Sequence, residues 1–285
     1  MLNSFFIEED LVAHFDFTHS YEAKQNLKNL LQKRISLEDI SIRQTLLKTF
    51  IQRWSILEGF SYSNFDMKEV MEFTKSPKRY QLNGFGDTYR FMFKKERFAI
   101  KAKCIQTIAF LNNLNLNHFS RHTNFSFPEC LQNKIDSIKK FFLDLKIDQN
   151  YKDIGRDKFA ISNTIAFLNA LGEIQEDIDN FWVSLFEYEM YWSIAKGIHI
   201  NSFTFPVFDN DDFSIAEFYH PLIKNAVKNS LTVNRNIILL TGPNMAGKST
   251  VLKSISLCVF LSHIGLAVPA QSCKMPFYDS FLFSI

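Results

Sequence analysis

The octapeptide Gly242–Ser249, with the sequence GPNMAGKS, constrains the fold of this chain more than any other feature. It matches the pattern GxxxxGK[ST], in which glycines let the backbone curl so that its N–H groups converge on phosphate oxygens. The apolar run Ile237–Leu240 before it predicts a short buried strand. The apolar spacing of residues 248–264 after it predicts a helix. A strand, a glycine-rich loop and a helix in this order predict a phosphate-binding loop at the positive N-terminal end of a helix.

The residue types in the loop predict its chemistry. Lys248 should reach the β- and γ-phosphates of a nucleotide as a point charge, and the Ser249 hydroxyl should ligate Mg²⁺. ATP and Mg²⁺ are therefore the expected ligands. A chance match is the alternative; it arises in about one in a hundred chains of this length, and the flanking strand and helix make it rarer. The predicted nucleotide-binding residues are Gly242, Pro243, Asn244, Met245, Ala246, Gly247, Lys248, Ser249 and Thr250.

The spacing of apolar residues changes near residue 200. From Tyr21 to about Glu189 the spacing is helical. One helical stripe consists of Leu131, Ile135, Ile138, Phe142 and Leu145. After Trp192 the chain is rich in β-favouring residues, interrupted by Pro206 and an acidic turn at 209–212. We therefore expect an α + α/β fold, with a helical domain at 1–199 and the first part of a P-loop NTPase domain at 200–285.

Charge, cysteine content and hydropathy indicate the compartment and the kinds of partner that we expect for this chain. The chain has 32 basic and 30 acidic side chains, a net charge of +2, so any contact with nucleic acid must be local. Its four cysteines contain no CxxC pair, which favours a reducing compartment over a disulfide framework. No stretch reaches the ~20 apolar residues of a membrane span, and the N-terminus does not resemble a signal peptide. We expect a cytoplasmic protein without a membrane partner.

The stretch FKKERFAIKAK at Phe93–Lys103 concentrates positive charge. Lysine and arginine side chains in such a stretch can neutralise DNA phosphates. A solvated helix face explains the same residues more simply, and we favour that explanation while keeping DNA contact open. The candidate DNA-contacting residues are Lys94, Lys95, Arg97, Lys101 and Lys103.

Beyond the octapeptide, the surrounding residues resemble one family. TGPNMAGKST at 241–250, SHIGLAVPA at 262–270 and FYDSFLFSI at 277–285 look like the ATPase domain of the MutS family of DNA mismatch-repair proteins. Upstream, AEFYHPLI at 216–223 resembles the strand with a His-Pro pair that precedes the loop in that family. More weakly, residues 35–50 resemble its core domain, through Arg43 and Gln44 ahead of an apolar helix.

The resemblance implies a function and partners. The helical part would correspond to the core and lever of a MutS protein. The chain would bind ATP with Mg²⁺, and it would bind DNA as a homodimer or with a MutS-like partner. Its role would lie in mismatch repair, or in related processing of DNA structures and recombination, through an ATP-driven conformational change. His220, from the His-Pro pair, and Val227, where the family often stacks a side chain on adenine, would lie near the nucleotide.

Parts of the family pattern are missing from the sequence. No aspartate-glutamate pair of the Walker B type follows the loop before Ile285, and Phe6-Ile7-Glu8 has no mismatch-sensing domain around it. We therefore expect a MutS-like chain truncated before the Walker B region and lacking the N-terminal mismatch-sensing domain. No complete catalytic set is expected, so hydrolysis of ATP by this chain stays open. The alternative function is a non-catalytic nucleotide-binding or interaction module, or a truncated gene product unable to hydrolyse ATP alone.

Overall fold

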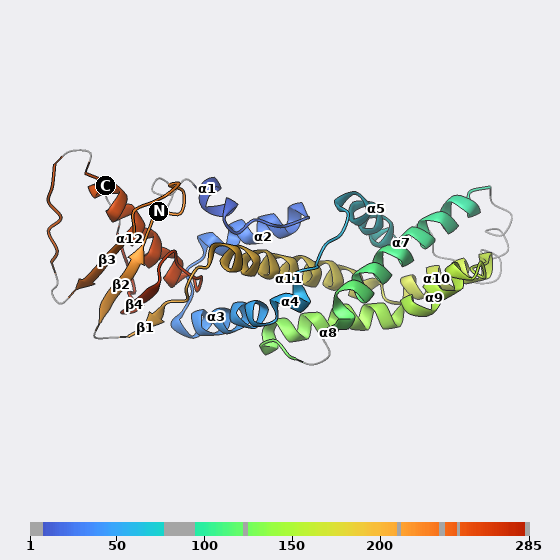
Figure 1. Cartoon of the computed structure of the whole chain (residues 1–285). Coiled ribbons are helices and arrows are strands. Elements are labelled where there is room, and N and C mark those ends of the chain that lie inside the picture. Colours follow the sequence, from blue (N-terminus) through green and yellow to red (C-terminus); the bar gives the residue numbers. More distant parts are fainter. Residues whose placement is uncertain are drawn as a thin grey trace. The chain divides into compact units, whose positions relative to one another are not determined.

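The computed structural model describes residues 8–76, 95–121, 125–209, 212–233, 237–243 and 246–282 (Figure 1). Contacts divide the chain into two compact units. The first unit contains Met1–Thr18, Lys24–Arg53 and Met190–Ile285, and the second contains His19–Ala23 and Trp54–Glu189. Because segments of the two units alternate along the sequence, long-range packing and not chain order defines them.

The first unit combines helices with a small mixed sheet. Its elements are α1 (Glu8–Ala13), most of α2 (Tyr21–Gln32), α3 (Leu37–Gln52), the second part of α11 (Gln175–Asn201), β1 (Val207–Phe208), β2 (Phe213–Phe218), β3 (Asn229–Val233), α12 (Lys248–His263) and β4 (Ser272–Met275). Strands appear after α11, where the sequence predicts the change from helical to β-favouring spacing. Among the described residues, no helix is both long and apolar enough to cross a membrane.

The four strands form one sheet in the order β1-β4-β2-β3. β1 runs parallel to β4, whereas β2 is antiparallel to both β4 and β3. Ile215 of β2 pairs with Cys273 of β4, and both side chains are buried. α12 contacts β2, so the helix that follows the glycine-rich loop packs on this sheet.

The predicted buried strand at Ile237–Leu240 is wrong. These residues have no regular secondary structure, and the side chains of Ile237 and Leu239 are 86% and 84% exposed. Four consecutive apolar residues become a buried strand only when neighbouring strands pair with the backbone and other elements cover both faces. The described residues give this segment no such neighbour, and the sheet of a P-loop domain around it is therefore not formed by them.

The second unit consists of helices. Its elements are α4 (Trp54–Leu57), α5 (Asn64–Lys75), α7 (Arg97–Asn117), the 3-10 helix η2 (Phe119–Arg121), α8 (Glu129–Asp144), α9 (Ile147–Gly155), α10 (Ile161–Glu173) and the first part of α11. The predicted stripe is confirmed: its first four residues lie on α8, Leu145 follows the end of that helix, and all five side chains are buried. Burial of one face per helix is the expected source of stability for such a unit.

Aromatic side chains join three helices of the second unit. Phe141 of α8 stacks on Phe181 of α11, with ring centroids 4.2 Å apart and an angle of 18° between the rings. The neighbouring Trp182 donates a hydrogen bond from Nε1 to Thr74 Oγ1 of α5 at 3.1 Å. A buried indole N–H needs an acceptor, and Thr74 supplies one, so this contact fixes α5 against α11.

A buried carboxylate fixes the start of α2 within the second unit. Glu189 accepts hydrogen bonds from the backbone N–H groups of His19 and Ser20, from Ser20 Oγ at 2.6 Å and from the Tyr62 hydroxyl. Ser20 Oγ in turn accepts from the Ala23 N–H at 3.2 Å, which caps the helix. A carboxylate is tolerated in a core when its oxygens are hydrogen-bonded, and here four donors meet that condition.

Candidate phosphate-binding site

The loop Gly242–Ser249 leads directly into α12, which begins at Lys248. Gly247 has a φ of 83° and Gly242 a φ of 153°, both in a region that residues with a side chain rarely adopt. The Val251 N–H donates to the Gly247 carbonyl oxygen at 3.0 Å and begins the helical hydrogen bonding. The two glycines of the sequence pattern are therefore needed for the backbone conformation of the loop.

The side chain of Lys248 folds back over the loop. Its Nζ donates to the carbonyl oxygens of Gly242 at 2.5 Å and Pro243 at 2.6 Å. An ammonium group has three donors, and its hydrogen bonds to charged oxygens are stronger than those to neutral carbonyls. Phosphate oxygens would therefore compete well for this group. Asn244 and Met245 of the predicted set lie outside the described residues.

The N-terminal end of α12 favours an anion. Its first turn contains no acidic residue, and the first N–H groups of a helix have no partner inside the helix. Ser249 is exposed beside Lys248, so its hydroxyl is accessible to a ligand. The described residues contain no group of three or more His, Cys, Asp or Glu side chains that could hold a metal ion. The exposed Ser249 hydroxyl is an oxygen of the kind that ligates Mg²⁺ beside a bound nucleotide.

The two residues predicted to lie near a nucleotide belong to the connection between β2 and β3. Burial lowers the pKa of His220 below its usual value, and the charges of Lys253 and His14 lower it further. Its Nδ1 is buried without a hydrogen-bond partner in the described part of the chain. Val227 is 80% exposed, and its contact with adenine stays a prediction. The sequence prediction did not name Lys253, whose charge acts on His220. Its position on α12, five residues after Lys248, is the sequence signal that could have identified it.

Arg43 and Gln44 of α3 donate hydrogen bonds to two backbone carbonyls, one at the end of α12 and one just before β1. Arg43 Nη1 donates to the Ile264 carbonyl oxygen at 2.5 Å, at the C-terminal end of α12. Gln44 Nε2 donates to the Pro206 carbonyl oxygen at 3.3 Å, just before β1. Gly265 has a φ of 75°, and a Cβ there would lie 3.1 Å from Arg43 Cδ. The close approach of Arg43 and the turn of the backbone both require glycine at this position.

The candidate DNA-contacting residues are partly described. Lys94 lies outside the described residues, and Lys95 is an exposed residue just before α7. Arg97 begins α7, and Lys101 and Lys103 follow on the same helix. Among the described ion pairs, none involves Lys95, Lys101 or Lys103. This arrangement suits either a solvated face or contact with phosphates.

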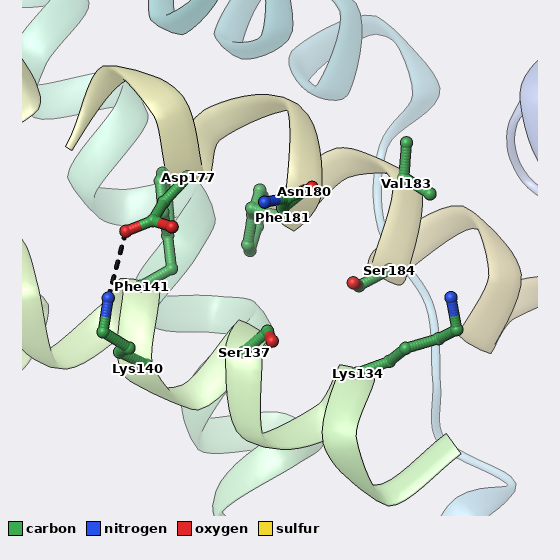
Figure 2. A pocket seen from close by; sticks show the side chains of 9 residues that line it. All are labelled: Lys134, Ser137, Lys140, Phe141, Asp177, Asn180, Phe181, Val183 and Ser184. Carbon is green, nitrogen blue, oxygen red and sulfur yellow. Dashed lines mark hydrogen bonds and ion pairs between the residues drawn. The ribbon is translucent and has the colours of Figure 1, made fainter. Parts of the chain in front are cut away.

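A pocket of about 210 Å³ lies between α8 and α11 in the second unit (Figure 2). Lys140 donates to Asp177 at 3.0 Å along its edge, the interaction drawn as a dashed line. Lys134, on the same helix, pairs with Glu187 at 2.7 Å. Both cations are thus already neutralised, and none of the predicted site residues lines the pocket. It supplies no chemistry to the candidate site.

Comparison with known proteins shows which proteins this chain is similar to. The model of MutS domain V matches residues 238–285, which include the loop and α12. The DNA mismatch repair protein MSH3 of Candida glabrata is 32% identical over 126 residues, which cover 41% of this chain and 12% of that protein. The DNA mismatch repair protein MutS of Clostridioides difficile is 36% identical over 101 residues, covering 32% of this chain and 11% of that protein.

A longer match reaches into the helical part of the chain. The DNA mismatch repair protein MutS of Fusobacterium nucleatum is 29% identical over 160 residues, which cover 52% of this chain and 18% of that protein. The chain therefore spans about a tenth to a fifth of the length of these relatives. Together, these findings show that residues 238–285 are similar to domain V of MutS proteins, and that part of the chain is similar to DNA mismatch repair proteins named MutS and MSH3.

Proposed function

We propose that this chain supplies nucleotide binding to a MutS-family protein of DNA mismatch repair, and that residues 242–250 hold ATP with Mg²⁺. The matching relatives are named as DNA mismatch repair proteins. The observation that carries the proposal is the position of Lys248 at the start of α12, with its ammonium group against two loop carbonyls. In the described part of the chain this charged group has neutral carbonyls as partners, and a charged group of this kind at the positive end of a helix favours binding of a polyphosphate.

The residues present fit this ligand. Gly242 and Gly247 give the backbone its turn, and Lys248 would exchange carbonyl oxygens for β- and γ-phosphate oxygens. The Ser249 hydroxyl would ligate Mg²⁺, which neutralises part of the phosphate charge. His220 and Val227 would face the base and sugar side of the nucleotide.

DNA and a second MutS-like chain are the proposed partners. In this proposal Lys95, Arg97, Lys101 and Lys103 contact phosphates of DNA. Nucleotide binding would act on α12 through Lys248, and the other end of this helix is held by Arg43 of α3. Movement of α12 on binding ATP would therefore reach α3, which is the route that we propose for an ATP-driven conformational change.

A second function, nucleotide binding without hydrolysis by this chain alone, has its own support. Among the described residues, Lys248 and Ser249 form no hydrogen bond or ion pair with a carboxylate. Hydrolysis needs a group that positions and activates water in addition to a phosphate cradle. If a partner supplies that group, this chain would bind ATP alone and hydrolyse it in the assembly.

Thermal unfolding with and without ATP and Mg²⁺ tests the proposed binding. The wild-type chain is expected to gain ~2.7 kcal/mol of stability when the free ATP concentration is 100 times the Kd. Lys248→Ala should abolish this gain. Lys33→Ala, which removes an exposed lysine of the same unit, should keep it. Equal stabilisation of the wild type and the Lys248 variant would reject the assigned site.

Phosphate release separates the two functions. The chain alone is expected to bind ATP while releasing phosphate no faster than the Lys248→Ala variant. Steady turnover by the wild-type chain that Lys248→Ala removes would reject binding without hydrolysis and favour an ATPase.

A further inference from the structure

The ring of His263, in the last turn of α12, is enclosed by aromatic side chains of the first unit. It is 1% exposed. The ring of Phe208 from β1 lies edge-on to it at 5.4 Å between centroids. The rings of Phe277 and Tyr278 stack on it, with centroids 5.3 and 5.7 Å from its own. The Phe281 ring lies edge-on to it, with the centroids 5.2 Å apart. The last three belong to residues 276–282, which follow β4 and are called here the Phe277 segment.

Two backbone groups fix the protonation state of this ring. The Val259 carbonyl oxygen lies 2.7 Å from His263 Nδ1, and a carbonyl can only accept, so Nδ1 carries a proton. The Tyr278 N–H lies 2.9 Å from Nε2 and can only donate, so Nε2 carries none. The arrangement therefore requires a neutral imidazole with its single proton on Nδ1.

We propose that His263 is a proton-operated latch: as a neutral ring it holds the Phe277 segment against α12, and protonation at Nε2 releases the segment. A proton on Nε2 would face the Tyr278 N–H, so an attractive hydrogen bond would become a contact between two donors. Attraction between the charged ring and its aromatic neighbours does not remove that contact. The segment must therefore move away before the second proton can be accommodated.

Burial and the positive charge of Arg34 both favour the neutral form of the His263 ring. Arg34, which follows α2, donates to the Tyr278 carbonyl oxygen at 2.6 Å, and its guanidinium lies 5.3 Å from the centroid of the Phe281 ring. Burial lowers the pKa of His263, the Val259 carbonyl opposes this in part, and the charge of Arg34 lowers the pKa further. The Tyr278 phenol, whose pKa burial raises, is neutral throughout the acidic range. On β4, Lys274 forms ion pairs with Asp209 and Asp212.

The direction of the pH effect follows from proton uptake. Once the segment opens, the ring reaches water and its pKa returns to about 6.5, above the value in the closed state. The open state therefore binds more protons, and closure weakens as the pH falls below about 6.5. At pH 5.0, about 1.5 units lower, the opening equilibrium can rise up to about thirtyfold. The latch does not require a nucleotide, although the same helix begins at Lys248.

Hydrogen exchange at the Tyr278 amide in the whole chain tests the latch. The readout is the protection factor, that is, the measured rate corrected for intrinsic exchange at each pH. From pH 7.5 to pH 5.0, protection of Tyr278 in the wild type should fall by threefold to thirtyfold, while the amide of Val251 in the first turns of α12 keeps its value within twofold. His263→Gln, which cannot titrate, should show no such pH dependence at Tyr278. His199→Gln, a change at an exposed histidine, should respond as the wild type does.

A titration of the His263 ring in the wild type covers the case in which the glutamine variant does not fold. Nitrogen NMR should show the Nδ1–H tautomer at pH 7.5, and ring protonation should have the same midpoint as the loss of Tyr278 protection. The proposal is overturned by an Nε2–H tautomer at pH 7.5. It is also overturned if Tyr278 stays protected after the ring is protonated, or if the His263→Gln variant keeps the wild-type pH dependence.

Discussion

Lys248 donates a hydrogen bond from its Nζ to the carbonyl oxygen of Gly242, the first residue of the glycine-rich loop, at 2.5 Å. The described partners of this ammonium group are neutral carbonyls, so its positive charge is not compensated within the loop. α12 adds the positive end of its dipole at the same place. The loop therefore combines a backbone conformation set by glycine with a charge that an anion can satisfy.

Replacing Gly247 with alanine should weaken ATP binding by about fivefold to tenfold. A Cβ at this position meets no atom within 4 Å, so the cost arises from the backbone. A φ of 83° costs an L-residue ~1 kcal/mol or more, and relief of this strain would move the loop N–H groups. ATP affinity in Mg²⁺ is the measurement. Gly155→Ala, where a Cβ also meets no atom, is the control and should bind as the wild type does; equal affinity of the Gly247 variant would contradict the role of its conformation.

Gly265→Ala should lower the free energy of unfolding by ~2–3 kcal/mol, because backbone strain adds to crowding of Arg43. Arg43→Ala should cost ~1.5–3 kcal/mol through loss of the hydrogen bond to Ile264. The double variant should cost less than the sum, since removal of the Arg43 side chain makes room for the new Cβ. Urea unfolding of the four chains measures this coupling. Strictly additive costs would show that the two residues do not press on each other.

Glu189→Gln should lower the free energy of unfolding by ~2–4 kcal/mol. The amide would place its own N–H donors against the donors of Ser20 and Tyr62, in a buried site. Glu187→Gln is the matched control on the same helix. Its ion pair with Lys134 is partly exposed, so the change should cost no more than ~1 kcal/mol. Similar costs for the two variants in urea unfolding would argue against a structural role of the Glu189 cluster.

If the basic end of α7 binds DNA, its lysines should set the salt dependence of binding. The test chain carries Lys95→Ala, Lys101→Ala and Lys103→Ala. The control chain carries Lys146→Ala, Lys152→Ala and Lys158→Ala, which remove the same charge from exposed positions of the same unit. The slope of log K against log salt should decrease by roughly 1 for each DNA phosphate that the test chain no longer neutralises. Equal slopes for the two chains would favour a solvated face.

The sequence predicts those parts of the molecule that depend on local spacing. The stripe from Leu131 to Leu145 identifies the buried face of α8, because a helix places every third or fourth residue on one side. The start of α12 at Lys248 follows from the glycine-rich pattern, which also contains Gly242 and Gly247, the two glycines that the loop conformation requires.

Other features depend on partners that lie far away in the sequence. Burial of Ile237–Leu240 needs neighbouring strands, and their apolar character alone does not provide them. In the sequence, nothing distinguishes Glu189 from other charged residues of a helix. In the structure it accepts hydrogen bonds from Tyr62 and Ser20, which are 127 and 169 residues away. The sequence likewise places His263 only at the end of a helix. The Tyr278 N–H that fixes its tautomer belongs to the segment after β4.

The most direct test of the central claim is calorimetric titration of ATP, in the presence of Mg²⁺, into the wild-type chain and the Lys248→Ala variant. If residues 242–250 hold the phosphates, the wild type will bind one ATP per chain, and Lys248→Ala will weaken binding by at least tenfold, the equivalent of ~1.4 kcal/mol. Saturable binding of equal affinity in both chains, or no binding by the wild type, would contradict a phosphate-binding function for this loop.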